Sequence, residues 1–239
     1  MCPREQAESN LASAIERTVT AGGHVLLPVP AVGISQELIF LLDRFTKGGR
    51  LQTKVLVEKI ISEATAVYEA YPEFLSKELG KYVLESETSV FGSQFSIVES
   101  ETLSPSEPAV VLAPSSMLIG GPSVGYLKQI ANDPKSMLIM LSYQSLETPG
   151  RALFEGSREI TIEGETIKLE CQVERIDGLG SHSDYNQLMA YIMRLRPKLR
   201  RVLVNHGERP KAQNLASMIN KQFRIQTQHP LVQEAIKLL

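Results

Sequence analysis

Uninterrupted apolar runs alternate with stretches where apolar residues recur every three or four positions. The runs predict buried strands, because apolar residues on both faces are typical of a parallel sheet. These strands are expected at residues 24–29, 54–58, 109–113 and 136–141. The helical spacing predicts helices at residues 8–20, 33–45, 64–75 (with a break near Pro72) and 124–131. The repeated order of strand, loop, helix and strand favours an α/β fold with a mainly parallel sheet and right-handed crossovers.

Two parts of the chain depart from this pattern. Residues 80–108 are polar and weakly periodic, and only a short strand at residues 95–98 is expected there. Residues 159–162 and 166–174 alternate apolar and polar positions, which predicts a hairpin across residues 163–165.

The C-terminal part again alternates between helical and extended patterns. Ser183 or Asp184 is a suitable N-cap for a helix, and Pro197 ends that helix. Its apolar face is expected to contain Leu188, Tyr191, Ile192 and Leu195. A strand at residues 201–204, a helix at 211–223, a short strand at 224–227 and a last helical turn at 232–239 are expected to follow.

Composition limits the classes of function. Hydrophobic residues make up 43% of the chain and charged residues 22%, as in ordinary proteins with a buried core. The net charge of −2 gives no overall attraction to nucleic acid, so any such binding needs a local patch. The basic candidates are Arg194, Arg196, Lys198, Arg200 and Arg201. Cations also suit a solvated helix C-terminus, and we rank that interpretation above phosphate contact.

Cysteine content and hydropathy indicate a cytoplasmic protein that does not enter a membrane. Cys2 and Cys171 are too few for a disulfide framework or a zinc ribbon, and they suit a reducing cytosol. No apolar run approaches the roughly 20 residues of a membrane-spanning helix. The N-terminus also lacks the pattern of a signal peptide.

Two of the four histidines follow predicted strands. His182 and His206 are 24 positions apart across one helix, so their rings could end on neighbouring strands. Imidazole is a good zinc ligand and a general acid near neutral pH, but from spacing alone we rank a pair of surface histidines in two loops above a functional site. His24 and His229 are interpreted as packed or loop residues. Since no His-x-His-x-Asp-His cluster is present, the chain has too few ligands for a complete zinc site.

A serine- and glycine-rich loop between a strand and a helix is a second candidate. Ser115, Ser116, Gly120 and Gly121 belong to it, and exposed N–H groups at a helix start favour an anion such as phosphate. The loop lacks Gly-Lys-Ser/Thr, so it is not a Walker loop. Glycines that serve only the turn geometry are an equally good explanation.

Several segments, in their order along the chain, resemble the β-CASP branch of the metallo-β-lactamase-fold nucleases. Within that branch the chain is most similar to archaeal homologues of the nuclease subunit of the cleavage and polyadenylation specificity factor. The segments that carry the resemblance are 22–29 with 35–37, 63–66 with 70–79, 116–128, 181–188 (Ser-His-Ser-Asp-Tyr-Asn-Gln-Leu) and 204–208 (Val-Asn-His-Gly-Glu). They extend over almost the whole chain.

The resemblance implies roles for the candidate residues. His182 matches the histidine of motif B, which implies proton transfer to the leaving group or contact with the scissile phosphate. His206 matches motif C, which implies a ligand of one of two zinc ions. The loop with Ser115, Ser116, Gly120 and Gly121 matches a region that faces the RNA backbone, and Ser183 and Asp184 adjoin His182 at the substrate.

The resemblance also implies a division of the chain. Residues 1–178 match the β-CASP domain, and residues 179–239 match the C-terminal segment of the metallo-β-lactamase αββα domain. The N-terminal half of that domain, with its His-x-His-x-Asp-His ligands, is not among these residues.

Two functions follow from this division. The first is one part of a zinc-dependent ribonuclease for RNA 3′-end processing or transcription termination, acting on single-stranded RNA. A chain or segment with the missing half would complete it, and family oligomers suggest a homodimer. The second is a catalytically inactive RNA-binding or scaffold subunit that pairs with an active homologue. Serines at positions 116, 142 and 181, where the family usually has glycine, favour this alternative.

Overall fold

A computed structural model describes residues 3–85, 94–100, 102–180 and 182–237 of the chain. The chain divides into two compact units, Met1–Gly180 and Ser181–Leu239. Each unit has its own sheet and its own core, and each is described separately below.

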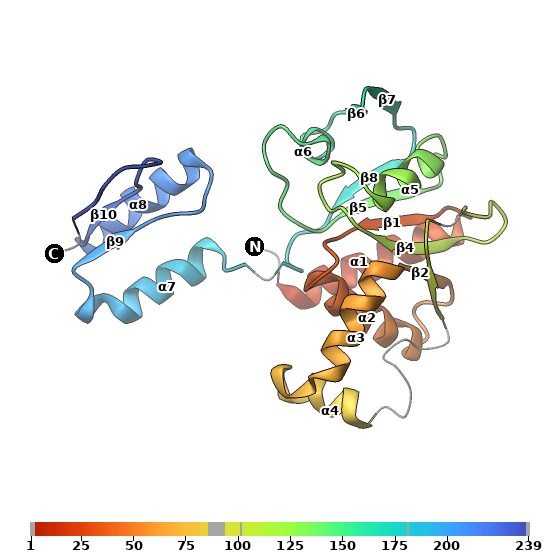
Figure 1. Ribbon diagram of the computed structural model, residues 1–239, viewed down its shortest axis with the longest axis horizontal. Helices are drawn as coiled ribbons and strands as arrows, with labels where there is room; N and C mark the ends of the chain where they lie inside the picture. The colour runs from red at the N-terminus through yellow and green to blue at the C-terminus, as the bar shows by residue number, and fades with distance from the viewer. Residues whose placement is uncertain (1–2, 86–93, 101, 181, 238–239) are drawn as a thin grey trace. The chain divides into compact units, whose positions relative to one another are not determined.

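The first unit is built on a six-stranded sheet in the order β3-β2-β4-β1-β5-β8, in which every neighbouring pair is parallel (Figure 1). Its strands are β1 (Val25–Pro28), β2 (Lys54–Glu58), β3 (Phe95–Val98), β4 (Ala109–Ala113), β5 (Met137–Met140) and β8 (Gln172–Arg175). The predicted α/β fold with a parallel sheet is confirmed. Five of the strands were expected, and β8 was not.

Both faces of this sheet are buried. Along β4, Val110 and Leu112 belong to one core cluster, whereas Val111 belongs to another. Successive side chains of a strand point to opposite faces, so the clusters lie on the two sides of the sheet. Residues of α1 (Arg4–Thr20) and α2 (Ile34–Lys47) complete the first cluster, and residues of α5 (Pro122–Ile130) complete the second.

The remaining helices of the first unit differ most from the expectation. The helix predicted at 64–75 is α3 (Lys59–Ala70), followed after Tyr71 by the single turn η1 (Pro72–Phe74). Two further helices were missed, α4 (Lys77–Glu85) and α6 (Pro149–Phe154).

Tyr82 connects helix α4 to α2, and Val83 beside it also packs against the first core cluster. The Tyr82 hydroxyl donates to Asp43 Oδ2 at 2.9 Å, and the Tyr82 ring packs edge-on against Phe40 with centroids 5.5 Å apart. These partners are on α2, about forty residues away in the sequence, so local periodicity in residues 80–108 could not reveal them.

The expected hairpin is only partly correct. β6 (Glu159–Ile162) pairs antiparallel with β7 (Glu165–Lys168), as predicted. The second arm does not continue to residue 174. The backbone N–H groups of Glu170 and Cys171 both donate to the Ala131 carbonyl, at 2.7 and 3.0 Å, and β8 then joins the large sheet beside β5.

The second unit is smaller. Its elements are α7 (Tyr185–Leu195), η2 (Arg196–Lys198), β9 (Arg201–Leu203), α8 (Arg209–Phe223) and β10 (Gln226–Gln228). The two strands pair in parallel, and Met189, Ile219, Phe223 and Ile225 form the core. The helical turn predicted at 232–239 is wrong, because the described residues of that segment, 232–237, are not helical.

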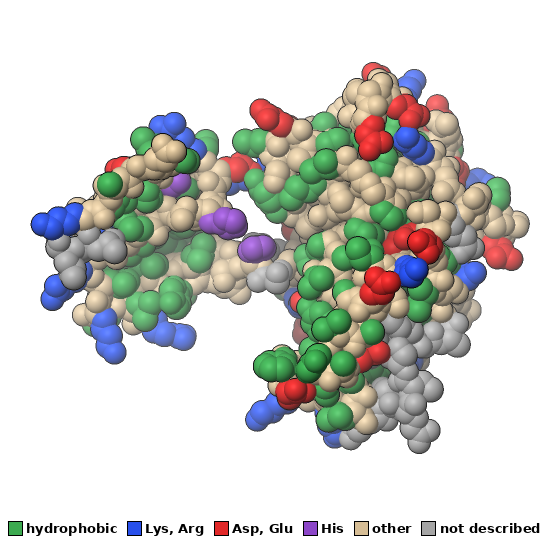
Figure 2. Space-filling model, in the orientation of Figure 1, with side chains coloured by type: hydrophobic (Ala, Val, Ile, Leu, Met, Phe, Trp, Pro, Cys, Tyr) green, Lys and Arg blue, Asp and Glu red, His purple; other side chains and the backbone are tan. Residues whose placement is uncertain are grey.

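Apolar side chains remain on the surface of this unit. Leu188 and Tyr191 of α7 were expected to be core-facing, but both are exposed, and the buried residue of this helix is Met189. Val232 is 94% exposed. Hydrophobic side chains are accordingly visible on the surface of both units in Figure 2. Across the described residues of the chain, no helix is long and apolar enough to cross a membrane.

Candidate functional site

His206 lies in the turn that joins β9 to α8. Its backbone has a φ of 66°, a left-handed conformation that is uncommon for residues other than glycine. The Asn205 side chain accepts the His206 backbone N–H at 2.7 Å and so supports this conformation locally. The side chain of His206 is exposed. The turn therefore presents an accessible imidazole at the carboxyl end of a strand, as the sequence predicted.

The neighbouring strand carries a different histidine from the one expected. β9 pairs with β10, and His229 follows β10 directly. His182 instead follows β8, which belongs to the other sheet. The expectation that His182 and His206 end on neighbouring strands is therefore wrong, because the break after β7 places β8 in the first unit.

His229 is more than a loop residue. Its Nδ1 lies 2.9 Å from the Val204 carbonyl oxygen, which links the residue after β10 to the residue after β9. A carbonyl oxygen only accepts, so Nδ1 carries the proton, and in the neutral ring Nε2 keeps its lone pair. The sequence predicted a short strand just before this position, at residues 224–227, but not its parallel pairing with the strand that precedes His206.

His182 precedes the start of α7 and is exposed. Asp184 is the N-cap of that helix: its Oδ1 accepts the Gln187 backbone N–H at 2.8 Å, and Gln187 Oε1 accepts the Asp184 N–H at 2.9 Å. This reciprocal pair is a capping box. One oxygen of Asp184 is thus committed to the helix, and Ser183 is exposed beside it. Contact of Ser183 and Asp184 with substrate stays a prediction.

A complete metal centre is not formed by these residues. Among the described residues, no group of three or more His, Cys, Asp or Glu side chains could hold a metal ion. Catalytic zinc generally has three protein ligands. The described donors therefore do not make a zinc site by themselves, and His206 provides one accessible nitrogen.

The serine- and glycine-rich loop follows β4 and leads into α5. Ser115, Gly120 and Gly121 line a cleft of about 780 Å³ at the carboxyl ends of β2, β3 and β4. Ser116 is not among its lining residues, and its carbonyl accepts from Gln144 Nε2 at 3.0 Å. Gly121 has a φ of 77°, so glycine is needed there for the turn. The structure thus brings three of the four expected loop residues to one cleft.

The start of α5 has few free donors for an anion. Pro122 has no N–H, the Ser123 N–H donates to the Pro114 carbonyl at 2.6 Å, and the Val124 N–H donates to the Gly121 carbonyl at 3.1 Å. A phosphate at this helix start could therefore accept hydrogen bonds only from N–H groups of the preceding loop. Contact of the loop with the RNA backbone stays a prediction.

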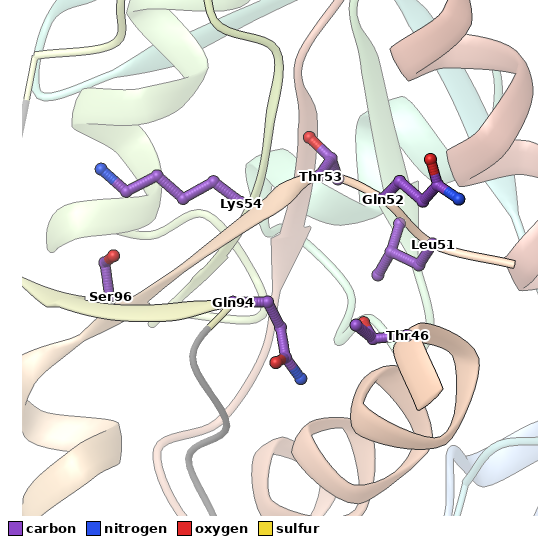
Figure 3. Close-up of a pocket in the computed structure, with 7 residues that line it drawn as sticks. All are labelled: Thr46, Leu51, Gln52, Thr53, Lys54, Gln94 and Ser96. Atoms are coloured by element: carbon purple, nitrogen blue, oxygen red, sulfur yellow. The ribbon is translucent and has the colours of Figure 1, made fainter. Parts of the chain in front are cut away.

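A second depression lies at the amino ends of β2 and β3, opposite the carboxyl ends that line the cleft. It has a volume of about 380 Å³ and is lined by Thr46, Leu51, Gln52, Thr53, Lys54, Gln94 and Ser96 (Figure 3). Lys54 and Gln52 extend away from each other in this view. The arrangement has no convergent set of polar groups, and we assign it no chemistry.

The five basic residues near the end of α7 differ in their hydrogen-bond partners. Arg201 donates to Gln226 Oε1 at 3.1 and 3.2 Å and to the Lys237 carbonyl at 2.6 Å, so it fastens β10 and the C-terminal segment. Arg194, Arg196, Lys198 and Arg200 are exposed. Four exposed cations remain for solvent or for phosphate.

Two protein families match this chain. The Beta-Casp domain family matches residues 35–153, and the family described as a Zn-dependent metallo-hydrolase RNA specificity domain matches residues 166–230. The second match begins within β7, before the first unit ends. The three histidines of the second unit, His182, His206 and His229, all lie inside it.

The chain is also similar to curated archaeal proteins. Transcription termination factor FttA of Cenarchaeum symbiosum (strain A) is 42% identical over 247 residues, which cover 98% of this chain and 38% of that protein. The factors of the same name from Thermococcus kodakarensis and Methanocaldococcus jannaschii are both 39% identical, over 99% and 98% of this chain. The chain spans 38–39% of the length of these relatives.

Proposed function

Because this chain belongs to the β-CASP family, we propose that it forms part of a zinc-dependent nuclease that cleaves single-stranded RNA during 3′-end processing or transcription termination. The relatives are named as transcription termination factors, which supports a role at RNA 3′ ends. In this proposal residues 1–178 are the β-CASP domain, and residues 179–239 are the closing segment of the metallo-β-lactamase domain.

One observation carries the proposal. His182 and His206 are both exposed, each next to the start of a helix, and both lie in the segment that matches an RNA-specificity family described as Zn-dependent. His206 would be a metal ligand. His182 would donate a proton to the oxygen that leaves phosphorus as water adds, because a positioned histidine can act as a general acid.

The proposal requires a second set of ligands. A segment with His-x-His-x-Asp-His, from the same polypeptide or from a separate chain, would supply the nitrogens and carboxylates that the described residues lack. The exposed apolar side chains of the second unit, among them Leu188 and Tyr191, are suited to pack against such a segment. A second copy of the chain is a further candidate partner.

The test is reconstitution. The chain is co-expressed with a metallo-β-lactamase segment that carries His-x-His-x-Asp-His, zinc is added, and cleavage of a labelled single-stranded RNA is followed. His182→Ala should lower the rate by about 100-fold or more at neutral pH, the range for loss of a general acid. His206→Ala should lower both the rate and the zinc content of the complex. Gln213→Ala, an exposed change on α8, is the matched control.

The outcomes separate the two functions. Unchanged cleavage after His206→Ala would refute its assignment as a ligand. RNA binding by the complex without any cleavage would favour the alternative, an inactive RNA-binding or scaffold subunit.

A further inference from the structure

The cleft at the carboxyl ends of β2, β3 and β4 has an apolar lining for which the proposed RNA cleavage gives no role. Its volume of about 780 Å³ is in the range of ligand pockets, and the carboxyl ends of parallel strands are where such pockets form. Two of its lining residues are isoleucines with large exposed fractions, Ile60 (51%) on α3 and Ile119 (58%) in the loop before α5. Pro114 and Pro122 add further apolar surface.

A buried carboxylate lines the same cleft. Glu58 ends β2 and is only 3% exposed. Its Oε1 accepts two hydrogen bonds, from the Tyr126 hydroxyl and from the Ser100 backbone N–H, both at 2.8 Å. Among the described residues, Oε2 has no hydrogen-bond partner. Oε2 is not one of the fully buried atoms that lack a partner, so this oxygen is open to a donor from a ligand.

The surrounding charge selects the kind of ligand. Glu63 is one helical turn after Ile60 and also lines the cleft, as does Glu99. The one basic lining residue, Lys59, forms an ion pair with Glu99 at 3.3 Å. Carboxylates therefore outnumber cations around the cleft, which opposes a phosphate and favours a cationic group.

We propose that this cleft binds an arginine side chain in a basic segment of a protein partner. The guanidinium would donate to Glu58 Oε2, with Glu63 at the mouth of the cleft. The methylene stem would pack against Ile60 and Ile119, because arginine buries its apolar stem while its charged head keeps polar partners. Arginine suits the site better than lysine, since its planar head has five donors and is less strongly hydrated. This assignment does not depend on the proposed nuclease activity, but it competes with the predicted contact of Ser115, Gly120 and Gly121 with the RNA backbone, because these residues line the same cleft.

The test measures peptide binding to the whole 239-residue chain. The probe is a fluorescein-labelled Gly-Leu-Arg-Leu-Gly peptide with a blocked C-terminus, and its control has citrulline, an uncharged analogue, in place of arginine. Fluorescence anisotropy should show binding of the arginine peptide and at least tenfold weaker binding of the citrulline peptide. Equal affinity of the two peptides, or no binding of either, would overturn the proposal.

Two substitutions locate the binding. Glu58→Gln keeps an oxygen that can accept from Tyr126 and Ser100 but removes the charge. It should weaken binding of the arginine peptide by about 30-fold, the effect of removing one partner of a buried charge pair. Glu170→Gln, an exposed glutamate that does not line the cleft, makes the same charge change and should have no effect. Equal weakening by both variants would show only a general charge effect and would overturn the assignment.

Ile119→Lys keeps the test decisive if Glu58→Gln folds poorly, because Ile119 is exposed. A lysine here repels arginine, so binding of the arginine peptide should weaken at least tenfold, whereas RNA binding in this cleft would become tighter. Tighter binding of a single-stranded RNA by Ile119→Lys, together with no change for the peptide, would assign the cleft to RNA instead. Binding of Mn²⁺ alone that depends on Glu58 would assign it to a cation and would also overturn the proposal.

Discussion

The two units of the chain both contain parallel strands, but they bury them very differently. In the first unit, six parallel strands have core clusters on both faces, and β4 is buried at every position. In the second unit, the sheet has two parallel strands of three residues each. One small hydrophobic core cluster packs in this unit, and Leu203 of β9 is exposed. Parallel sheets normally occur with both faces covered.

This difference concerns how completely each unit covers its own sheet. The first unit satisfies the rule for parallel sheets with its own helices. The second unit leaves Leu188 and Tyr191 of α7 and Val232 of the C-terminal segment exposed, but the first unit also exposes apolar residues such as Phe74 and Leu84, so the contrast rests on the sheets alone.

The largest expected effect is in the core of the first unit. Leu112 of β4 is fully buried, so Leu112→Ala should lower the free energy of unfolding by about 2–5 kcal/mol. Hydrogen exchange during denaturant titration would measure both units at once. Amides of β1 and β4 should exchange faster while those of β9 remain unchanged. Equally faster amide exchange in β9 would show that the two units unfold together and would contradict the contrast between them.

The next largest effect on stability is expected at Gly23, which lies close to the backbone of Lys135 and Ser136. A Cβ at Gly23 would lie 2.2 Å from the Lys135 carbonyl oxygen and 2.7 Å from the Ser136 nitrogen. Gly23→Ala should therefore destabilise the first unit by about 1–3 kcal/mol, as overpacking does. Gly125→Ala on α5 is the matched control, since no atom lies within 4 Å of its Cβ position. It should stabilise the helix by up to about 1 kcal/mol, and thermal unfolding of both variants would check the pair.

His24 makes the first unit sensitive to acid. It is buried before β1, and its Nδ1 accepts the Ala109 backbone N–H at 3.2 Å. Burial lowers the pKa of His24 below its ordinary value of 6.5, against the opposing effects of Asp133 and a hydrogen bond to the Ser104 backbone. Because the folded-state pKa is the lower one, the stabilisation is present above pH 6.5 and is lost as pH falls through the folded-state value.

The expected slope is at most about 1.4 kcal/mol per pH unit for one proton. The measurement is the free energy of unfolding as a function of pH, together with exchange of the Ala109 amide. His24→Asn keeps an acceptor near Ala109 without a titrating ring, so its curve should be flatter than that of the wild type below pH 6.5. Identical curves would exclude His24 as the origin of the acid sensitivity.

The smallest effect on stability is expected in the second unit. Tyr191 is 60% exposed, so Tyr191→Ser should change the free energy of unfolding by less than about 0.5 kcal/mol. The same change should weaken association with the completing metallo-β-lactamase segment, which sedimentation of the mixed chains would measure. A large loss of stability in the isolated chain would mean that α7 already packs its apolar face within the unit.

The main sheet was predictable because its strands carry their own signal. Consecutive apolar residues at 55–57 and 109–113 favour strands with both faces buried, and helical periodicity between the strands indicates the crossovers. The candidate histidines were also visible, since His206 follows such a run and precedes glycine. Their arrangement was not predictable, because it depends on which sheet each strand joins.

By itself, the sequence determined the parallel α/β sheet, the turn that exposes His206 and the motif resemblance that identifies the family. These features depend on residues near one another in the chain, so pattern and local geometry suffice for them. Tertiary structure alone decided that β8 pairs with β5, that His229 contacts the residue after β9, and that Glu58 is buried beside exposed isoleucines. Each of these depends on groups brought together from distant positions by packing, and hydrophobic periodicity contains no information about such pairs.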